Sequence, residues 1–169
     1  ASLMSYAFIY TPLKKVSSLA VLVGAFPGAI PPLLGWVAAT GEFTSAAIVL
    51  FLLQFFWQFP HFWSIAWILD DDYKKAGYQL LPSNTGRTKE SAMQVIIYSA
   101  VLIPLSFLPH IFGISGELSM FCVTAGSILL TLFSFKLYQS LSIKDAKRLM
   151  FASILYNPLV LISLLIDKL

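Results

Sequence analysis

Long apolar runs, separated by short polar segments, make up most of this chain of 169 residues. The apolar positions within each run are continuous and do not alternate with polar ones, which predicts helices and argues against a β-barrel. A helix of about twenty apolar residues crosses the hydrocarbon layer of a membrane. The runs therefore predict five membrane-spanning helices, over residues 17–39, 45–69, 91–111, 118–137 and 148–166.

The segments outside these runs complete the expected topology. Residues 1–9 are apolar and have the character of the last turns of one more span, so we expect the chain to be the C-terminal part of a longer protein. Polar loops are expected on one side of the membrane over residues 10–16, 70–90 and 138–147, and turns on the other side over 40–44 and 112–117.

Prolines lie inside several of the runs. Pro27, Pro31 and Pro32 fall within the span 17–39, where they predict a kink or a break in the helix. The span 91–111 again holds internal prolines, Pro104 and Pro109.

The composition supports a membrane protein. Hydrophobic residues make up 58% of the chain and charged residues only 11%, whereas a soluble domain has about 25% charged residues. Inside a bilayer the backbone polar groups must be satisfied within the protein, which helices achieve. The expected fold class is therefore all-α, a polytopic bundle of transmembrane helices in a lipid bilayer.

The basic residues gather on one side of the expected topology. The two turns on the other side hold no basic residue, only Glu42 and Glu117, and Lys168 at the tail is the single exception. Such an asymmetry marks the cytoplasmic side of a membrane and gives no reason to expect a nucleic-acid partner. The ten residues on the basic side are Lys14, Lys15, Lys74, Lys75, Arg87, Lys89, Lys136, Lys144, Lys147 and Arg148.

Three consecutive acids, Asp70, Asp71 and Asp72, follow the span 45–69, and Lys74 and Lys75 come directly after them. Mg²⁺ prefers oxygen ligands and often binds through one or two carboxylates together with substrate phosphates. Three neighbouring acids also repel each other, and a bound cation would relieve that repulsion. The triplet therefore fits a magnesium–diphosphate site, although a solvated helix end that balances the two lysines explains it equally well.

A second candidate group lies in the basic loop near the start of the chain, where Tyr10 is followed by Lys14 and Lys15. A lysine can neutralise a phosphate oxygen as a point charge, and a phenol can add a hydrogen bond. The alternative is that these lysines only anchor the loop on the cytoplasmic side.

The third candidate group lies within the span 45–69, where Gln58 and His61 stand one turn apart beside Trp57. Polar groups at membrane depth are costly and usually face the interior of a helix bundle. A histidine there could bind haem iron or move a proton. A hydrogen bond to a neighbouring helix is the structural alternative.

Taken together, these motifs resemble the protohaem IX farnesyltransferases, or haem O synthases, a branch of the UbiA superfamily of intramembrane prenyltransferases. The resemblance covers nearly the whole chain and keeps the order of the motifs. The segments that carry it are Tyr10-Thr-Pro-Leu-Lys14-Lys15, Gly28-Ala-Ile-Pro-Pro32-Leu-Leu-Gly35-Trp36, Trp57-Gln58-Phe-Pro60-His61-Phe62, Asp71-Asp72-Tyr73-Lys74-Lys75-Ala76-Gly77 and Leu81-Pro82.

The resemblance implies a fold of nine transmembrane helices around a central cavity. This chain would hold the end of the fourth helix and the fifth to ninth, as residues 1–169 of a single prenyltransferase domain. The family's first acidic motif, Asn-x-x-x-Asp-x-x-x-Asp, would then lie outside the chain, which implies that the fragment alone is inactive. The resemblance also implies the bacterial cytoplasmic membrane, with the acidic and basic loops facing the cytoplasm.

The activity that the resemblance implies is transfer of a farnesyl group from farnesyl diphosphate to a vinyl group of haem B, giving haem O for haem–copper oxidases. Mg²⁺ would be the cofactor, and haem A synthase or oxidase assembly proteins are expected partners. Asp71, Asp72 and Lys14 would be catalytic, with Asp70 as a further metal ligand. The implied substrate-binding residues are Tyr10, Lys15, Trp57, Gln58, His61, Lys74 and Lys75.

Three other readings stay open at this point. A UbiA-type enzyme could prenylate an aromatic quinone precursor in place of haem. An ion-coupled transporter also uses broken, proline-rich helices, but it binds substrate near the middle of the membrane, whereas these acids follow the end of a span. A scaffold without catalytic activity is a third reading.

Overall fold

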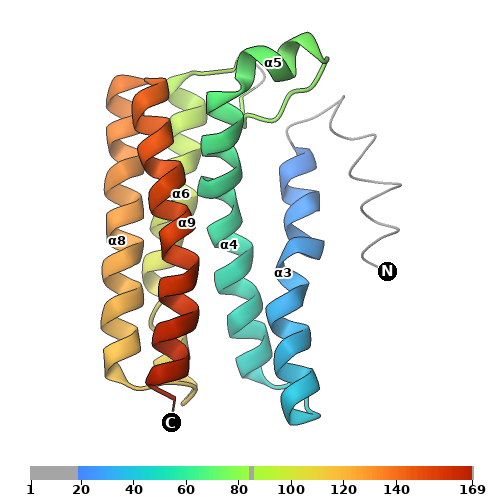
Figure 1. Cartoon of the computed structure of the whole chain (residues 1–169), viewed down its shortest axis with the longest axis vertical. Coiled ribbons are helices and arrows are strands. Elements are labelled where there is room, and N and C mark those ends of the chain that lie inside the picture. Colours follow the sequence, from blue (N-terminus) through green and yellow to red (C-terminus); the bar gives the residue numbers. More distant parts are fainter. Residues whose placement is uncertain (1–18, 84–85, 169) are drawn as a thin grey trace.

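The computed structural model describes residues 19–83 and 86–168 (Figure 1). The described part is helical and contains no β-strand, only an isolated bridge between Ser115 and Lys168. The helices are α3 (Leu19–Thr40), α4 (Ser45–Ile68), α5 (Asp70–Lys75), α6 (Lys89–Leu105), α7 (Leu108–Ile111), α8 (Glu117–Ser140) and α9 (Ile143–Ile166).

Five helical segments are long and apolar enough to cross a membrane, namely α3, α4, α6 continued by α7, α8 and α9. This confirms the all-α fold class and the five expected spans. The partial span expected over residues 1–9 and the basic loop 10–16 lie outside the described residues.

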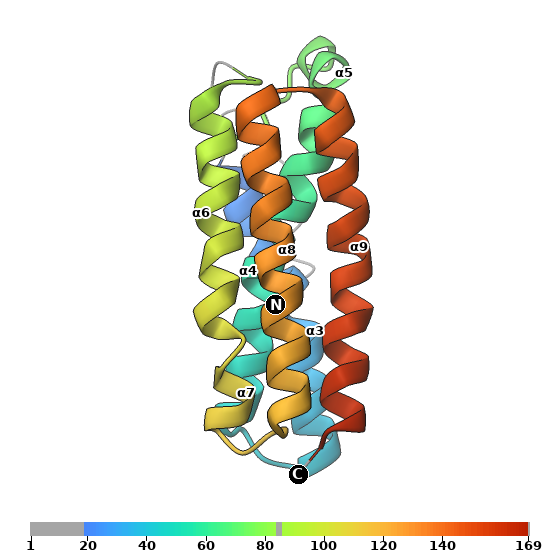
Figure 2. The same ribbon diagram turned by 90° about the vertical axis from the view of Figure 1, so that its left-hand side faces the viewer.

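Helices α4, α6, α8 and α9 pack side by side into a bundle, and α3 packs along α4 on the side away from α8 (Figures 1 and 2). Helix α4 is therefore central, because it contacts α3, α6 and α9. The short helix α5 lies across the end of the bundle at which α4 finishes. The basic residues of the described part lie at this same end, except for Lys168 beside the C-terminus.

Buried hydroxyl groups link the helices of the bundle. The Ser99 and Ser134 hydroxyls lie 2.8 Å apart between α6 and α8, and Ser127 lies 3.0 Å from the Tyr156 hydroxyl between α8 and α9. Because lipid gives apolar helices little reason to associate, small residues and interhelical hydrogen bonds become important for packing. The contact between α4 and α6 is made instead by aromatic rings, with Phe59 and Tyr98 centroids 4.4 Å apart.

Helix α3 is attached to α4 through Gln58. This buried side chain donates from Nε2 to the Ala25 carbonyl oxygen (3.1 Å) and to the Gln54 carbonyl oxygen (3.2 Å). It reaches α3 because the opposing position is Gly28, where a Cβ atom would overlap Gln58 Oε1. Gln58, expected to bind substrate, therefore has its amide in the contact between α3 and α4.

One expected loop is partly helical and another is mostly helical. Residues 70–75 of the expected loop 70–90 form α5, and the expected loop 138–147 is reduced to Leu141 and Ser142, with α9 starting at Ile143 and not at residue 148. The Ser142 hydroxyl caps α9 by accepting from the Asp145 amide (3.1 Å), and Leu141 takes a left-handed conformation that ends α8. Helices with such caps extend beyond the apolar layer, which hydropathy alone does not reveal.

The prolines act differently in the two spans where they were noted. Helix α3 is unbroken through Pro27, Pro31 and Pro32, so the expected break is absent. Each proline removes one N–H donor, and the surrounding backbone hydrogen bonds keep the segment helical, as a lipid environment requires. The other span is interrupted after Leu105, and Pro109 then lies in the first turn of α7, where a missing N–H costs little.

We expect Gly28→Ala to lower the free energy of unfolding of the intact protein by about 1–3 kcal/mol, because the new methyl group displaces the hydrogen-bonded Gln58 amide. Gly35→Ala is the matched control, since its Cβ would meet nothing within 4 Å. Thermal unfolding in detergent compares the two variants. Equal unfolding temperatures would contradict the conclusion that Gln58, packed against Gly28, attaches α3 to α4.

Candidate functional site

The three consecutive acids lie on α5, directly after the end of α4. Neighbouring residues of a helix point in directions about 100° apart, so three contiguous carboxylates cannot converge on one point. Asp70 is buried, whereas the side chains of Asp71 and Asp72 are 69% and 74% exposed. Because the three acids are consecutive residues of a helix, one of them is buried and the other two are exposed.

Each acid has a cationic partner. Asp70 Oδ2 lies 2.8 Å from Lys74 Nζ, and the loop passes closely over this pair at Gly86, where a Cβ atom would overlap Lys74 Nζ. Asp72 Oδ1 lies 3.6 Å from Lys75 Nζ in an exposed pair. The sequence-predicted residues Lys74 and Lys75 thus balance acids of the same helix.

Asp71 and Asp72 have the donor chemistry and exposure that suit Mg²⁺. That ion keeps several waters and binds through one or two carboxylates completed by substrate phosphates. Residues 19–83 and 86–168 contain no group of three histidine, cysteine or acidic side chains placed to hold a metal ion by themselves. The exposed carboxylates fit half of a metal site that further oxygen ligands would complete.

Arg87 fixes the junction between α4 and α5, and sequence reasoning gave it no role beyond charge. Its Nε donates to the Trp67 carbonyl oxygen (2.7 Å) and its Nη2 to that of Ile68 (3.3 Å). Its Nη1 also lies 3.0 Å from Asp71 Oδ2. The guanidinium satisfies carbonyl groups at the end of α4, where a positive charge is favourable, and holds α5 in place.

His61 lies in the contact between α4 and α9. Its Nδ1 is 2.9 Å from Ser153 Oγ, and its ring stacks on Trp57 with centroids 5.0 Å apart at 12°. Trp57 Nε1 donates to the Ser153 carbonyl oxygen at 2.8 Å. The structure thus brings Trp57 and His61 together on Ser153, a residue that the sequence gave no reason to single out.

The hydrogen-bond network assigns the tautomer of His61. Ser153 has one hydroxyl proton, and it donates that proton to the Met150 carbonyl oxygen (2.6 Å). Both contacts of Ser153 are satisfied together when its hydroxyl donates to Met150 and its oxygen accepts from Nδ1–H of His61, which favours the tautomer with the hydrogen on Nδ1. The lone pair is left on Nε2, which has no hydrogen-bond partner among the described residues.

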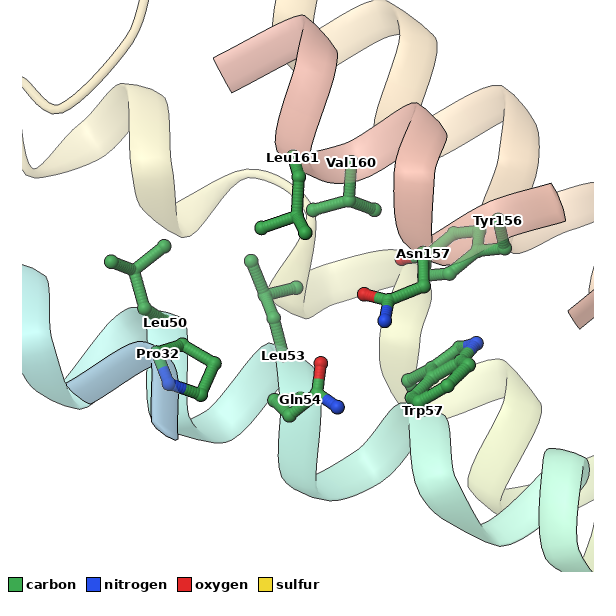
Figure 3. Close-up of a pocket in the computed structure, with 9 residues that line it drawn as sticks. All are labelled: Pro32, Leu50, Leu53, Gln54, Trp57, Tyr156, Asn157, Val160 and Leu161. Carbon is green, nitrogen blue, oxygen red and sulfur yellow. The ribbon is translucent and has the colours of Figure 1, made fainter. Parts of the chain in front are cut away.

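A small cavity lies between α3, α4 and α9, next to Trp57 (Figure 3). Its volume is about 20 Å³, and it is lined by the amides of Gln54 and Asn157 with apolar residues such as Pro32. A cavity of this size holds about one water molecule when polar groups line it. Neither amide side chain has a hydrogen-bond partner in the part of the chain that the structure describes.

The remaining candidates, Tyr10, Lys14 and Lys15, lie outside the described residues. The described candidates form two separate groups, one on α5 and one around His61. Since His61 lies seven residues before Ile68, the groups are separated by about 10 Å along the helix axis.

Comparison with known proteins places these features in a family context. Residues 1–155 match the model of the UbiA prenyltransferase family. The chain is 52% identical over 167 residues to a protein of Cytophaga hutchinsonii and 50% identical over 172 residues to one of Flavobacterium johnsoniae, both named Protoheme IX farnesyltransferase. A mitochondrial protein of that name from Arabidopsis thaliana is 36% identical over 172 residues.

These alignments cover 99% of the chain but only 58%, 57% and 39% of the three relatives, in that order. The chain thus spans a little over half the length of the bacterial relatives it matches. No solved structure matches the chain.

Arg87→Ala should loosen α5. Loss of the hydrogen bonds to Trp67, Ile68 and Asp71 should speed hydrogen exchange of the α5 amides by tenfold or more, because charge-assisted hydrogen bonds contribute about 1.5–3 kcal/mol. Hydrogen-exchange mass spectrometry measures the change. Lys75→Ala is the control, because an exposed ion pair contributes little. Equal hydrogen-exchange rates of the α5 amides in both variants would contradict the conclusion that Arg87 anchors α5.

Proposed function

The chain belongs to the UbiA prenyltransferase family, and from that premise we propose that the protein transfers a farnesyl group from farnesyl diphosphate to a vinyl group of haem B, giving haem O. The observation that carries this proposal is the similarity, over nearly all of this chain, to proteins named Protoheme IX farnesyltransferase. Haem O would then serve haem–copper oxidases, and haem A synthase or oxidase assembly proteins are the proposed partners.

The geometry of α5 supports a diphosphate site. Asp71 and Asp72 are exposed at the end of an apolar helix, at the end of the bundle where the basic residues gather. A substrate with a charged head and an apolar tail fits that boundary, with its head at the surface and its tail among the helices. We propose that Asp71 and Asp72 hold Mg²⁺ there, and that Asp70 orients Lys74 from beneath them.

Bound Mg²⁺ would stabilise the negative charge that develops on the diphosphate as the carbon–oxygen bond breaks. The chain's own cations add to that effect. We propose that Lys14 neutralises a phosphate oxygen, that Tyr10 and Lys15 also bind the diphosphate, and that Lys74 and Lys75 raise the positive potential around α5. Further oxygen ligands would complete the metal site.

The acceptor binds along the face of α4 that carries Trp57 and His61, which we call the aromatic wall. We propose that Trp57 and His61 contact the haem, while Gln58 supports this wall by fixing α3 to α4. Aromatic faces also shield an allylic cation from water and stabilise it through cation–π contact.

The protein is an integral membrane protein, as its family and its five apolar helices indicate. We propose that it lies in a bacterial cytoplasmic membrane with α5 facing the cytoplasm. The concentration of lysine and arginine at the α5 end of the bundle supports this orientation.

Asp72→Ala should lower turnover about a hundredfold, since a metal contact to the leaving group is worth several kcal/mol in the transition state. The assay supplies farnesyl diphosphate, haem B and Mg²⁺ to membranes that contain the intact protein, and mass spectrometry identifies the haem products. Glu90→Gln is the matched control, because it removes an exposed acid at the same end of the bundle.

A haem carrying a hydroxyethylfarnesyl group, lost on chelation of Mg²⁺, would establish both the reaction and its metal. Near wild-type turnover in the Asp72 variant would rule out this aspartate as a ligand. Unmodified haem beside folded protein would remove the haem substrate, and aromatic quinone precursors would be the next acceptors to assay.

A further inference from the structure

The reaction proposed above requires a water molecule within the membrane. Farnesyl diphosphate loses diphosphate, which leaves with the electron pair of the carbon–oxygen bond. The terminal vinyl carbon of the haem supplies its π electrons to the new carbon–carbon bond, so the inner vinyl carbon becomes electron-deficient. A water oxygen then bonds to that carbon, and one proton must leave to give the hydroxyl group. No electrons are gained or lost overall.

We propose that His61 is the base that accepts this proton, through its Nε2 atom, and that Ser153 is the positioning residue that makes Nε2 available. This inference rests on the proposed function and assigns a group to its hydration step. The hydrogen bonds of this residue pair leave one nitrogen of His61, Nε2, without a partner among the described residues.

Ser153 controls which nitrogen of His61 is basic. Its hydroxyl proton is donated to Met150, so its oxygen takes the Nδ1 hydrogen of His61 at 2.9 Å. Nδ1 is therefore occupied and Nε2 keeps the lone pair, as in a neutral imidazole. Stacking on Trp57 holds the plane of the ring, and Trp57 is itself fixed to the Ser153 carbonyl oxygen.

The depth of His61 suits the hydration step. It lies about 10 Å below the end of α4, as measured along the helix axis. The reacting carbon of the prenyl group is bonded to a diphosphate held at α5, so bond formation takes place only a few ångströms further into the bundle. His61 lies about two helical turns below the end of α4, in the direction in which the prenyl tail extends from the diphosphate into the bundle.

The chain also provides a place for water at this wall. Trp57, on which His61 stacks, lines the cavity of about 20 Å³ that Gln54 and Asn157 share. Amide groups without partners among the described residues attract a water molecule, and the cavity has room for about one.

His61 cannot accept a proton and bind iron at the same time through Nε2. The Nδ1 atom is engaged with Ser153, so the single lone pair of Nε2 serves either a water proton or a metal. A base role therefore predicts that the haem spectrum of the loaded protein does not depend on His61, whereas axial ligation predicts that it does.

The test measures the ratio of products formed by the intact protein in membranes with haem B, farnesyl diphosphate and Mg²⁺. Without a base, the cation loses a proton from the adjacent carbon and yields a prenylated haem lighter by one water. We expect His61→Phe, which keeps an aromatic ring, to lower the hydroxylated share of prenylated haem at least tenfold. Ser153→Ala should lower it to a smaller extent, and Ser153→Thr, which keeps the hydroxyl group, should restore it.

Ser134→Ala is the matched control, because it removes another buried interhelical hydroxyl, on the contact between α6 and α8 away from α4. It should leave the product ratio unchanged. If Ser134→Ala and Ser153→Ala shift the ratio equally, the effect is one of packing and the inference is wrong. The two Ser153 variants decide the matter even if His61→Phe does not fold.

Three further outcomes would overturn the inference while the proposed function stands. They are an unchanged product ratio in His61→Phe, complete loss of prenyl transfer in the folded variant, and a shifted Soret band when the variant is loaded with haem alone. Absence of any prenylated haem from the wild-type protein would instead contradict the proposed function itself.

Discussion

The need to satisfy polar groups inside a lipid environment is the constraint on which the rest of this structure depends. Ser153 illustrates it best, because its carbonyl oxygen accepts from Trp57, its hydroxyl donates to Met150 and the same oxygen accepts from His61. One small residue thereby joins α9 to α4 and orients the ring that we propose is reactive. Where apolar surfaces alone give little reason for helices to associate, the contact that holds the bundle together can also arrange a site.

The sequence was sufficient for the fold class and the number of spans, because hydropathy depends only on local composition. It was less reliable wherever a helix end depends on a side-chain hydrogen bond. The cap from Ser142 to the Asp145 amide starts α9 several residues before its apolar run, so a segment expected to be a loop is helical. Similarly, the three prolines of α3 leave it unbroken, since the backbone bonds around them persist in a bundle where no water replaces them.

The sequence drew attention to the acids and the histidine of the candidate site, whose roles stay a prediction, but it did not reveal how they are arranged. The triplet Asp70–Asp72 suggested a cluster, whereas helix formation directs its carboxylates apart and buries one of them. Arg87 and Ser153 could not be found in this way, because they act across 16 and 92 residues of sequence, on Asp71 and His61. An isolated arginine or serine carries no local pattern, and only the packing of α4 against its neighbours gives it a partner.

Helix α4 also explains how a charged group at the surface and a histidine inside the bundle can serve one reaction. A helix is stiff over the two turns between His61 and Ile68, so the interval between them is set by the backbone and not by flexible side chains. The only joint in this path lies between α4 and α5, and Arg87 spans that joint by bonding to carbonyl groups on one side and to Asp71 on the other. In the proposed reaction, leaving-group departure at α5 and hydration near His61 are therefore held in register by α4 and by its junction with α5, which Arg87 anchors.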